Sequence, residues 1–456
     1  MIPTTEVSSG TQDALLFYLA MLSILLVIGT ILRLKVPFLK KYYIPASLVA
    51  GFIGLLCGKY FLGIIPAHIT SAWSNLSGRL IVIVFAPMLM GKKKRSAKQF
   101  ARKTFNATCY AYLGCFAQYA IPLILAAVVF IPLLKVNPLF ATTFEEGWAG
   151  GHGTASGMLA VFEEVGWAEG QSIAVTNATV GLVAGIFGGV TLINIGVRKG
   201  WTRFLKANGT TVGIENKEEE LYTENRPVDT TLSISGQVID NYAFHAMLLG
   251  VAIFLGYLMN RALKIYLNFS LSWFVTAMFA GGLLQLVLNK TKWGDAVDMR
   301  VMSRIQGISL EFLIAGAVAS LNVSVVIDYA LPILITSVAL FAFMLFFALV
   351  YARGAFGDTW FENAMMMYGT YTGVAATGIL LLKVCDPEAK SDALDMYAAR
   401  APFSSWATGG GVITSMAPIW VAQYGITRMT ILFTVGAVVA ALLPVLTRTW
   451  YSIKQK

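Results

Sequence analysis

The stretch Gly153-Thr154-Ala155-Ser156-Gly157 and the stretch Gly369-Thr370-Tyr371-Thr372-Gly373 share the pattern G-T-x-[ST]-G. Each lies in a longer apolar segment that also holds acidic residues and clustered glycines, at about 139–166 and about 356–386. A dipeptide Phe-Glu precedes each, as Phe144-Glu145 and as Phe361-Glu362. Glycine and buried charge both disfavour a simple membrane-spanning helix. We therefore predict that both segments are re-entrant hairpins with these motifs at their tips.

The composition around the hairpins is that of an integral membrane protein. Of 456 residues, 57% are hydrophobic and 13% charged, whereas soluble domains average about 25% charged. This excludes an ordinary soluble enzyme, a disordered chain and a nucleic-acid-binding domain. A membrane-crossing helix needs about 20 apolar residues. We predict an all-α fold with about eleven crossings, at 14–33, 44–63, 76–91, 105–134, 171–197, 242–260, 269–289, 303–327, 329–351, 398–424 and 427–447.

The distribution of Lys and Arg predicts the orientation. With the N-terminus outside, most of the 34 Lys and Arg residues fall in loops on the inside, as the positive-inside rule requires. The opposite orientation reverses the ratio. We expect the N-terminus outside, the C-terminus in the cytoplasm, and hence a multi-pass protein of the bacterial inner membrane.

The span count divides the chain into two repeats of opposite orientation. Residues 1–197 form the first repeat, with four spans, a hairpin and a fifth span. A charged cytoplasmic linker at 198–241 follows, and residues 242–447 repeat the pattern and add one helix at 427–447. Residues 448–456 form a cytoplasmic tail. One hairpin then enters from outside and the other from inside, as in many secondary transporters.

Hairpin tips at membrane depth suit particular ligands. Glycines let the backbone turn and expose N–H and C=O groups. Unwound carbonyls suit a small hard cation, and helix N-termini suit carboxylates. An anionic solute with Na⁺ is the expected cargo, with sodium held by backbone carbonyls near Gly153 and Gly369. The helices after the tips add polar candidates, whose hydroxyls could instead bond to their own helix backbone: Asn177 and Thr179 after the first tip, and Ser404, Ser405 and Thr408 after the second.

Ionisable residues within apolar segments are further candidates. Glu311 lies in an apolar helix and could bind Na⁺, carry a coupling proton, or pair with Arg304 or Arg400. We expect Glu145 and Glu146 near the outer surface, with ligand contact as the alternative. His152 could bond to the hairpin backbone or meet the substrate.

An enzyme is disfavoured. The sequence contains no H-E-x-x-H, G-x-S-x-G or P-loop G-K-[ST] motif, and nothing supplies a nucleophile–base pair or a metal triad.

Three stretches resemble the bacterial glutamate:sodium symporter family, of which the chain is a divergent member. They are Phe38 to Pro45 running into Val49-Ala50-Gly51, the first tip Gly150-Gly151-His152-Gly153-Thr154, and Ala178 to Val183 continuing to Gly188-Gly189. The resemblance implies Na⁺-coupled glutamate symport, two inverted repeats, a homodimer in the lipid bilayer, and elevator-like movement of the hairpin-bearing part. The alternatives are another small carboxylate or amino acid as cargo, and protons in place of sodium.

The resemblance also implies the residues that line the substrate site. They are Gly150, Gly151, His152, Gly153, Thr154 and Ser156 from one hairpin, and Gly369, Thr370, Thr372, Gly373 and Thr377 from the other. Asn177, Thr179, Ser404, Ser405, Thr408 and Glu311 are the candidates for ion coupling. The second tip differs from the family pattern and contains Tyr371, so we expect that tip to contribute to substrate choice.

Overall fold

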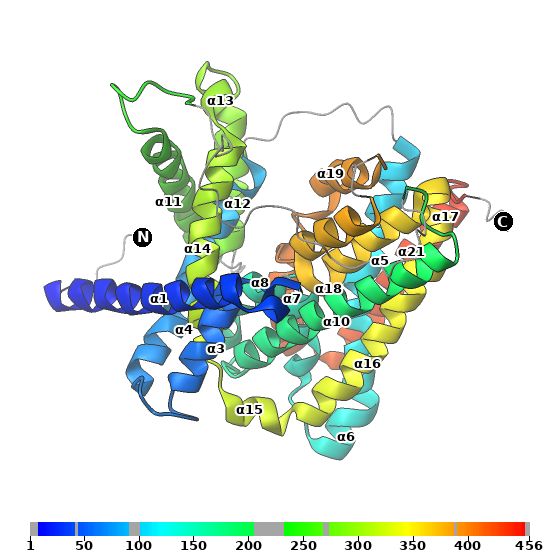
Figure 1. Cartoon of the computed structure of the whole chain (residues 1–456), viewed down its shortest axis with the longest axis horizontal. Helices are drawn as coiled ribbons and strands as arrows, with labels where there is room; N and C mark the ends of the chain where they lie inside the picture. The colour runs from blue at the N-terminus through cyan, green and yellow to red at the C-terminus, as the bar shows by residue number, and fades with distance from the viewer. Residues whose placement is uncertain are drawn as a thin grey trace. The chain divides into compact units, whose positions relative to one another are not determined.

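A computed structural model describes residues 8–41, 44–90, 101–204, 232–267, 273–386 and 390–451. Throughout these ranges the secondary structure is helical (Figure 1). The chain divides into two compact units, and each unit takes segments from both halves of the sequence. The predicted all-α class is confirmed.

Unit 1 comprises residues 1–94, 156–160 and 215–321. Its helices are α1 (Ser9–Lys35), α2 (Pro37–Lys41), α3 (Ala46–Cys57), α4 (Ala67–Phe85), the 3₁₀ turn η1 (Ala86–Leu89), α11 (Asn241–Leu267), α12 (Trp273–Leu288), α13 (Trp293–Ala296) and α14 (Met299–Ala319). Small residues allow close packing of these helices. A Cβ on Gly54 would lie 2.7 Å from the Ala319 side chain, and the Trp73 indole donates to the Tyr18 carbonyl over 2.9 Å.

Unit 2 comprises residues 95–155, 161–214 and 322–456. From the first half of the chain it takes α5 (Ala101–Leu125), η3 (Ala126–Phe130), α6 (Ile131–Leu134), η4 (Pro138–Thr142), α7 (Thr143–Trp148), most of α8 (Gly151–Gly157) and α9 (Leu159–Glu164), and α10 (Gly170–Arg198). From the second half it takes α15 (Val323–Asp328), α16 (Ala330–Phe346), η5 (Phe347–Tyr351), α17 (Ala352–Phe356), η6 (Gly357–Thr359), α18 (Trp360–Cys385), α19 (Ala393–Ser404), α20 (Val412–Tyr424) and α21 (Ile426–Leu446). Within this unit α5 packs along α21, and α10 packs along α18 (Figure 1).

The two halves of unit 2 repeat one order of elements. In the first half α5 continues through a π-helical turn, η3, into the short α6, and a 3₁₀ turn then leads to α7. In the second half α16 continues through a π-helical turn, η5, into the short α17, and a 3₁₀ turn leads to α18. A residue with positive φ ends each short helix, Lys135 at 54° and Gly357 at 66°. The two halves of unit 2 therefore share one order of elements, and the opposite orientation of the two repeats stays a prediction.

Within the described ranges, eight helices are long and apolar enough to cross a membrane. They lie at Ser9–Lys35, Ala67–Leu89, Ala101–Leu134, Gly170–Arg198, Asn241–Tyr266, Met299–Ala319, Ala330–Ala375 and Ile426–Leu446. Two predicted spans, 44–63 and 269–289, coincide with the shorter apolar helices Ala46–Cys57 and Trp273–Leu288. A third, 398–424, is divided between α19 and α20.

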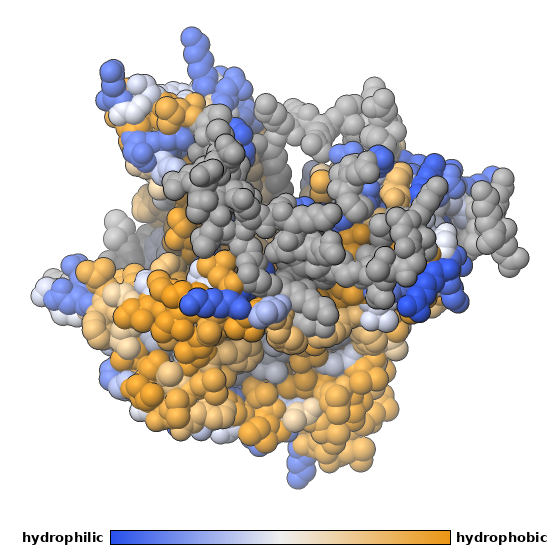
Figure 2. Space-filling view, in the orientation of Figure 1, coloured by the Kyte–Doolittle hydropathy of each residue, from blue (hydrophilic) through white to orange (hydrophobic). Residues whose placement is uncertain are grey.

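Apolar side chains cover the exposed surface of α16 and α6, at the lower right of Figure 2. They include the exposed Leu133, Leu331, Leu334 and Val338. An apolar outer surface suits helices in contact with lipid. The linker predicted at 198–241 falls mostly outside the described residues, which stop at 204 and resume at 232.

Candidate functional site

The first hairpin segment breaks between α7 and α8, at Gly150 and Gly151. Gly151 has φ of +68°, a conformation that glycine adopts without the steric cost of a side chain. Residues 153–157 of the predicted tip lie within α8, after the break. The G-T-x-S-G motif is therefore helical, and the turn precedes it.

The second hairpin segment breaks inside α18. Gly373 has φ −155° and ψ 38°, and Val374 has φ 64° and ψ 175°. A β-branched residue at positive φ is strained, by about 1–3 kcal/mol, and such strain is typical of functional sites. In this segment the motif at 369–373 ends at the break, in Gly373, whereas in the first segment the motif comes after the break.

The chain folds back on itself at the second break. A Cβ placed on Gly369 would lie 2.6 Å from the Gly378 nitrogen and 2.7 Å from its Cα. In an uninterrupted helix these two residues would be about 13 Å apart along the axis. The two parts of α18 therefore run side by side on either side of Gly373 and Val374.

The breaks themselves define which residues of the two segments correspond. A Cβ on Gly150 would lie 2.7 Å from the Thr154 Cβ, and a Cβ on Gly373 would lie 2.7 Å from the Thr377 hydroxyl. In each case a glycine before the break makes room for a threonine four residues later. By this criterion Gly150 corresponds to Gly373, and Thr154 corresponds to Thr377. This differs from the correspondence that the two G-T-x-[ST]-G motifs predicted.

The two breaks meet inside unit 2. A Cβ on Gly151 would collide with the Val374 side chain. Helix α10 supports both segments through residues without bulky side chains. A Cβ on Gly181 would lie 2.5 Å from the Thr372 carbonyl oxygen and 3.0 Å from the Trp148 ring, and a Cβ on Gly185 would lie 2.5 Å from the Thr372 hydroxyl. The predicted tips therefore share one surface of α10.

The polar residues predicted after the first tip contact that tip. The His152 ring Nε2 lies 3.0 Å from the hydroxyl of Thr179, a side chain of α10. Asn177 is fully buried and donates to the Thr143 hydroxyl over 2.9 Å. Its side-chain carbonyl oxygen has no hydrogen-bond partner among the described residues, and it is therefore available to a ligand.

Most predicted hydroxyl groups donate to their own helix. The acceptors are carbonyl oxygens four residues earlier, for Thr370, Thr372, Thr377, Ser404 and Thr408. A hydroxyl that donates in this way keeps lone pairs that can coordinate a cation. Ser405 follows directly after α19 and is half-buried. Ser156 is buried near the end of α8, and Glu311 is exposed on α14 of unit 1.

Glu145 and Glu146 are fully buried within the protein, and their expected position near the outer side of the membrane stays a prediction. Glu145 accepts hydrogen bonds from the Gly409 N–H, the Tyr119 hydroxyl and the Thr414 hydroxyl, each over 2.8 Å. Neither carboxylate oxygen of Glu146 has a partner among the residues that the structure describes. The Thr142 hydroxyl, one turn earlier, donates instead to the Leu139 carbonyl.

Glu362 repeats the arrangement in the second half of the chain. It is fully buried, and one carboxylate oxygen accepts the Arg203 N–H over 2.7 Å. Each Phe-Glu dipeptide therefore anchors the start of a hairpin segment to backbone of the other half. The repeated dipeptide was the one signal of this role in the sequence. No sequence pattern indicated the partners of these glutamates, because the tertiary fold alone brings them together. The partners are Tyr119, Thr414 and Arg203.

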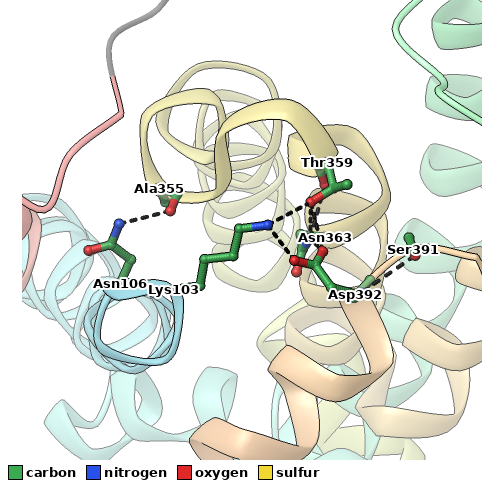
Figure 3. Close-up of polar contacts among 8 residues, drawn as sticks. Lys103, Asn106, Ala355, Thr359, Asn363, Ser391 and Asp392 are labelled. Atoms are coloured by element: carbon green, nitrogen blue, oxygen red, sulfur yellow. Dashed lines mark hydrogen bonds and ion pairs between the residues drawn. The ribbon is translucent and has the colours of Figure 1, made fainter. Parts of the chain in front are cut away.

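A polar cluster holds the base of the second segment (Figure 3). Asp392 pairs with Lys103 and accepts hydrogen bonds from Thr359 over 2.7 Å and from Asn363 over 3.0 Å. Burial raises the pKa of Asp392, but the bonds from Lys103, Thr359 and Asn363 outweigh it and hold the pKa below its usual value. Beside the cluster, Asn106 donates to the Ala355 carbonyl over 2.9 Å. These contacts join α5, η6, α18 and α19.

Comparison with known proteins identifies the protein family of this chain. The chain matches the model of the sodium/glutamate symporter family over residues 13–379, whereas no curated protein matches it. Among solved structures it is similar to the sodium proton antiporter of Methanocaldococcus jannaschii at pH 8, with 15% identity over 94% of this chain and 99% of that one, and a TM-score of 0.42. The family match covers both hairpin breaks and the helix that supports them. The chain therefore belongs to the sodium/glutamate symporter family, a family of transporters and not of enzymes.

Proposed function

We propose that this protein is a secondary active transporter that carries glutamate, or a similar small anionic amino acid, together with Na⁺ in symport. One observation carries the proposal: Gly151 and Val374, at the breaks of two helical segments, meet against α10. Non-helical backbone at membrane depth requires burial in protein or a water-filled cavity. Two such breaks at one place supply unpaired backbone groups for an anion and a cation.

The substrate and ion sites follow from this meeting point. In the proposal the two segments are re-entrant hairpins of inverted repeats, and the residues around both breaks contact the substrate. The substrate site comprises Gly150, Gly151, His152, Gly153, Thr154 and Ser156 with Gly369, Thr370, Thr372, Gly373 and Thr377. Na⁺ is cotransported cargo, and Asn177, Thr179, Ser404, Ser405 and Thr408 are the proposed coupling residues. The free carbonyl oxygen of buried Asn177 is a suitable ligand for such an ion.

The division into units supports an elevator-like mechanism. The first half of the chain contributes α1, α3 and α4 to unit 1, and the second half contributes α11, α12 and α14. Unit 2 takes the second hairpin segment and the first one apart from residues 156–160. We propose that unit 2 carries substrate and ion across the membrane as one body, while unit 1 forms the scaffold of a homodimer. The protein would lie in the bacterial inner membrane with its N-terminus outside and its C-terminus in the cytoplasm.

Proton coupling is the second candidate, and Glu146 favours it. A fully buried carboxylate without a hydrogen bond among the described residues is costly when charged. Binding and release of a proton would relieve that cost during transport. Glu146, rather than the exposed Glu311, is the residue that would carry such a proton.

Uptake of labelled glutamate into proteoliposomes distinguishes these functions. We expect accumulation when an inward Na⁺ gradient is applied at equal pH on both sides, and none when an inward proton gradient is applied without Na⁺. Accumulation with the proton gradient alone would instead establish proton coupling. Failure to take up glutamate under either gradient would exclude it as the cargo.

A further inference from the structure

A buried arginine without a counter-ion lies beside the second hairpin. Arg400, on α19, is only 4% exposed. Its guanidinium donates one hydrogen bond, from Nη1 to the Ser404 hydroxyl over 2.9 Å, although the group has five N–H donors. Its Nε has no partner, and no carboxylate lies within ion-pair distance in the described parts of the chain. A buried charge of this kind is costly unless an anion joins it.

The Arg400 guanidinium lies against two tyrosine rings, one of which belongs to the segment that holds the second break. The Arg400 guanidinium carbon lies 4.5 Å from the centre of the Tyr397 ring and 5.9 Å from the centre of the Tyr371 ring. Tyr371 stands two residues before Gly373, where the helix breaks. Aromatic faces stabilise a cation without neutralising it. The guanidinium thus lies beside a side chain of the broken segment, and its charge is still available to an anion.

Tyr371 is itself held firmly against α5. Its hydroxyl donates to the Ala111 carbonyl over 2.9 Å, and its own carbonyl accepts from the Gln118 amide over 2.5 Å. Its ring lies 3.1 Å from the position that a Cβ on Gly114 would take. The ring therefore cannot swing away from Arg400 without the loss of these contacts. This gives the tyrosine of the second G-T-x-[ST]-G motif a structural role beside Arg400.

Arg353 shows that burial beside aromatic rings does not by itself define such a site. It lies in α17, 5.3 Å from the Trp201 ring centre and 4.7 Å from that of Trp360. It is only half-buried, and its aromatic partners stand at the end of α10 and the start of α18. Neither ring lies as close in sequence to a break as Tyr371, which stands two residues before Gly373. Arg353 is therefore a matched control for Arg400.

We propose that Arg400 binds the side-chain carboxylate of a dicarboxylate substrate and so selects glutamate over its neutral amide. This deepens the proposed function and rests on it. The planar guanidinium can donate two parallel hydrogen bonds to a carboxylate, and a lysine cannot reproduce this geometry. The backbone groups at the breaks would then bind the α-amino and α-carboxylate groups, which glutamate and glutamine share.

The test compares glutamate with glutamine in four proteins. Purified wild type, Arg400→Gln, Arg400→Lys and Arg353→Gln are titrated with each amino acid in saturating Na⁺, and the apparent Kd is read from thermal stabilisation. The ratio of the two Kd values is independent of the yield of folded protein. We expect Arg400→Gln to weaken glutamate binding at least about thirtyfold, which corresponds to about 2 kcal/mol. Its glutamine binding should change less than about threefold.

The other two variants show whether a change in preference is specific to the guanidinium group and to the position of Arg400. Arg400→Lys should retain part of the preference for glutamate, and Arg353→Gln all of it. An unchanged ratio in Arg400→Gln, or an equal loss of preference in Arg353→Gln, would overturn the assignment of Arg400. If the wild type binds a dicarboxylate other than glutamate, glutamate is excluded as the substrate but the assignment of Arg400 is still tested. The test is then the ratio of the Kd values for that dicarboxylate and for its monoamide. If wild type binds no dicarboxylate, the proposed function and this assignment both fail.

Discussion

Glu145 joins three parts of the chain through one carboxylate. It lies on α7 of the first hairpin segment and accepts hydrogen bonds from Tyr119 on α5, Gly409 before α20, and Thr414 on α20. All three donors converge on a side chain that is completely buried. Hydrogen bonds to a buried charged group are stronger than neutral ones, and a donor left without its acceptor is destabilising. We infer that Glu145 fixes the first hairpin against the second half of the chain.

Replacing Glu145 tests this role. In Glu145→Gln one acceptor oxygen becomes an NH₂ group, which cannot accept from any of the three donors. We expect a loss of stability of about 1–3 kcal/mol, measured as a lower midpoint of thermal unfolding in detergent. The control is Glu163→Gln, since Glu163 is exposed on α9 of the same segment. Equal unfolding midpoints for the two variants would contradict the role assigned to Glu145.

At the scale of elements, the breaks in the two segments are the feature that matters for function. Their approximate places were predictable, because glycine clusters and acidic residues interrupt two apolar stretches at 139–166 and 356–386. Their exact positions were not predictable. The repeated G-T-x-[ST]-G motif drew attention to residues that, apart from Gly373, turn out to be helical, whereas the breaks occur at Gly151 and at Gly373 and Val374. A valine at positive φ is set by surrounding contacts, which local sequence does not reveal.

The contact between the breaks predicts an asymmetry between two glycines. Gly151 and Gly166 both have positive φ, at 68° and 76°, but only Gly151 has a neighbour, Val374, where a Cβ would go. Alanine at either position costs about 1–2 kcal/mol of backbone strain. We expect Gly151→Ala also to lower Na⁺-driven uptake at least about tenfold, and Gly166→Ala to leave uptake per folded protein nearly unchanged. Similar uptake by both variants would show that the meeting of the breaks is not needed.

The polar cluster at the base of the second segment predicts a pH dependence. Because the pKa of Asp392 is lowered in the folded protein, its stabilisation is complete above the unfolded value of about 3.9 and is lost as the pH falls through the lower folded value. The stability difference between wild type and Asp392→Asn should therefore be constant from about pH 5 to pH 8 and shrink below about pH 4. Chemical denaturation at several pH values measures it.

Two further variants test whether the pH dependence arises at the polar cluster around Asp392 (Figure 3). Asp358, in the adjoining 3₁₀ turn η6, is exposed, so Asp358→Asn should alter stability little at any of these pH values. Lys103→Met should remove most of the pH-dependent difference, because Lys103 is the charged partner of Asp392. A difference that persists unchanged in the Lys103→Met background would mean that the pair does not lower the Asp392 pKa.

At the scale of the whole molecule, the sequence predicted the apolar segments better than their number and assembly. Continuous apolar runs are visible without knowledge of tertiary contacts, but about eleven spans were predicted, whereas eight helices of the described residues are long and apolar enough to cross a membrane. The assembly into two units was not predictable, because each unit draws on both halves of the chain. Burial of Glu145 was missed for the same reason: its partners at Gly409 and Thr414 are more than 260 residues away.

Sodium-linked binding of glutamate tests the central claim most directly. Glutamate is titrated into the purified protein by calorimetry, in Na⁺ and in choline at equal ionic strength, and Na⁺ affinity is then measured with and without glutamate. If one site at the paired breaks holds both, each ligand must strengthen the other by the same factor. We expect at least about tenfold tighter glutamate binding in Na⁺ and a matching gain for Na⁺. Equal glutamate affinities in Na⁺ and choline would contradict the claim.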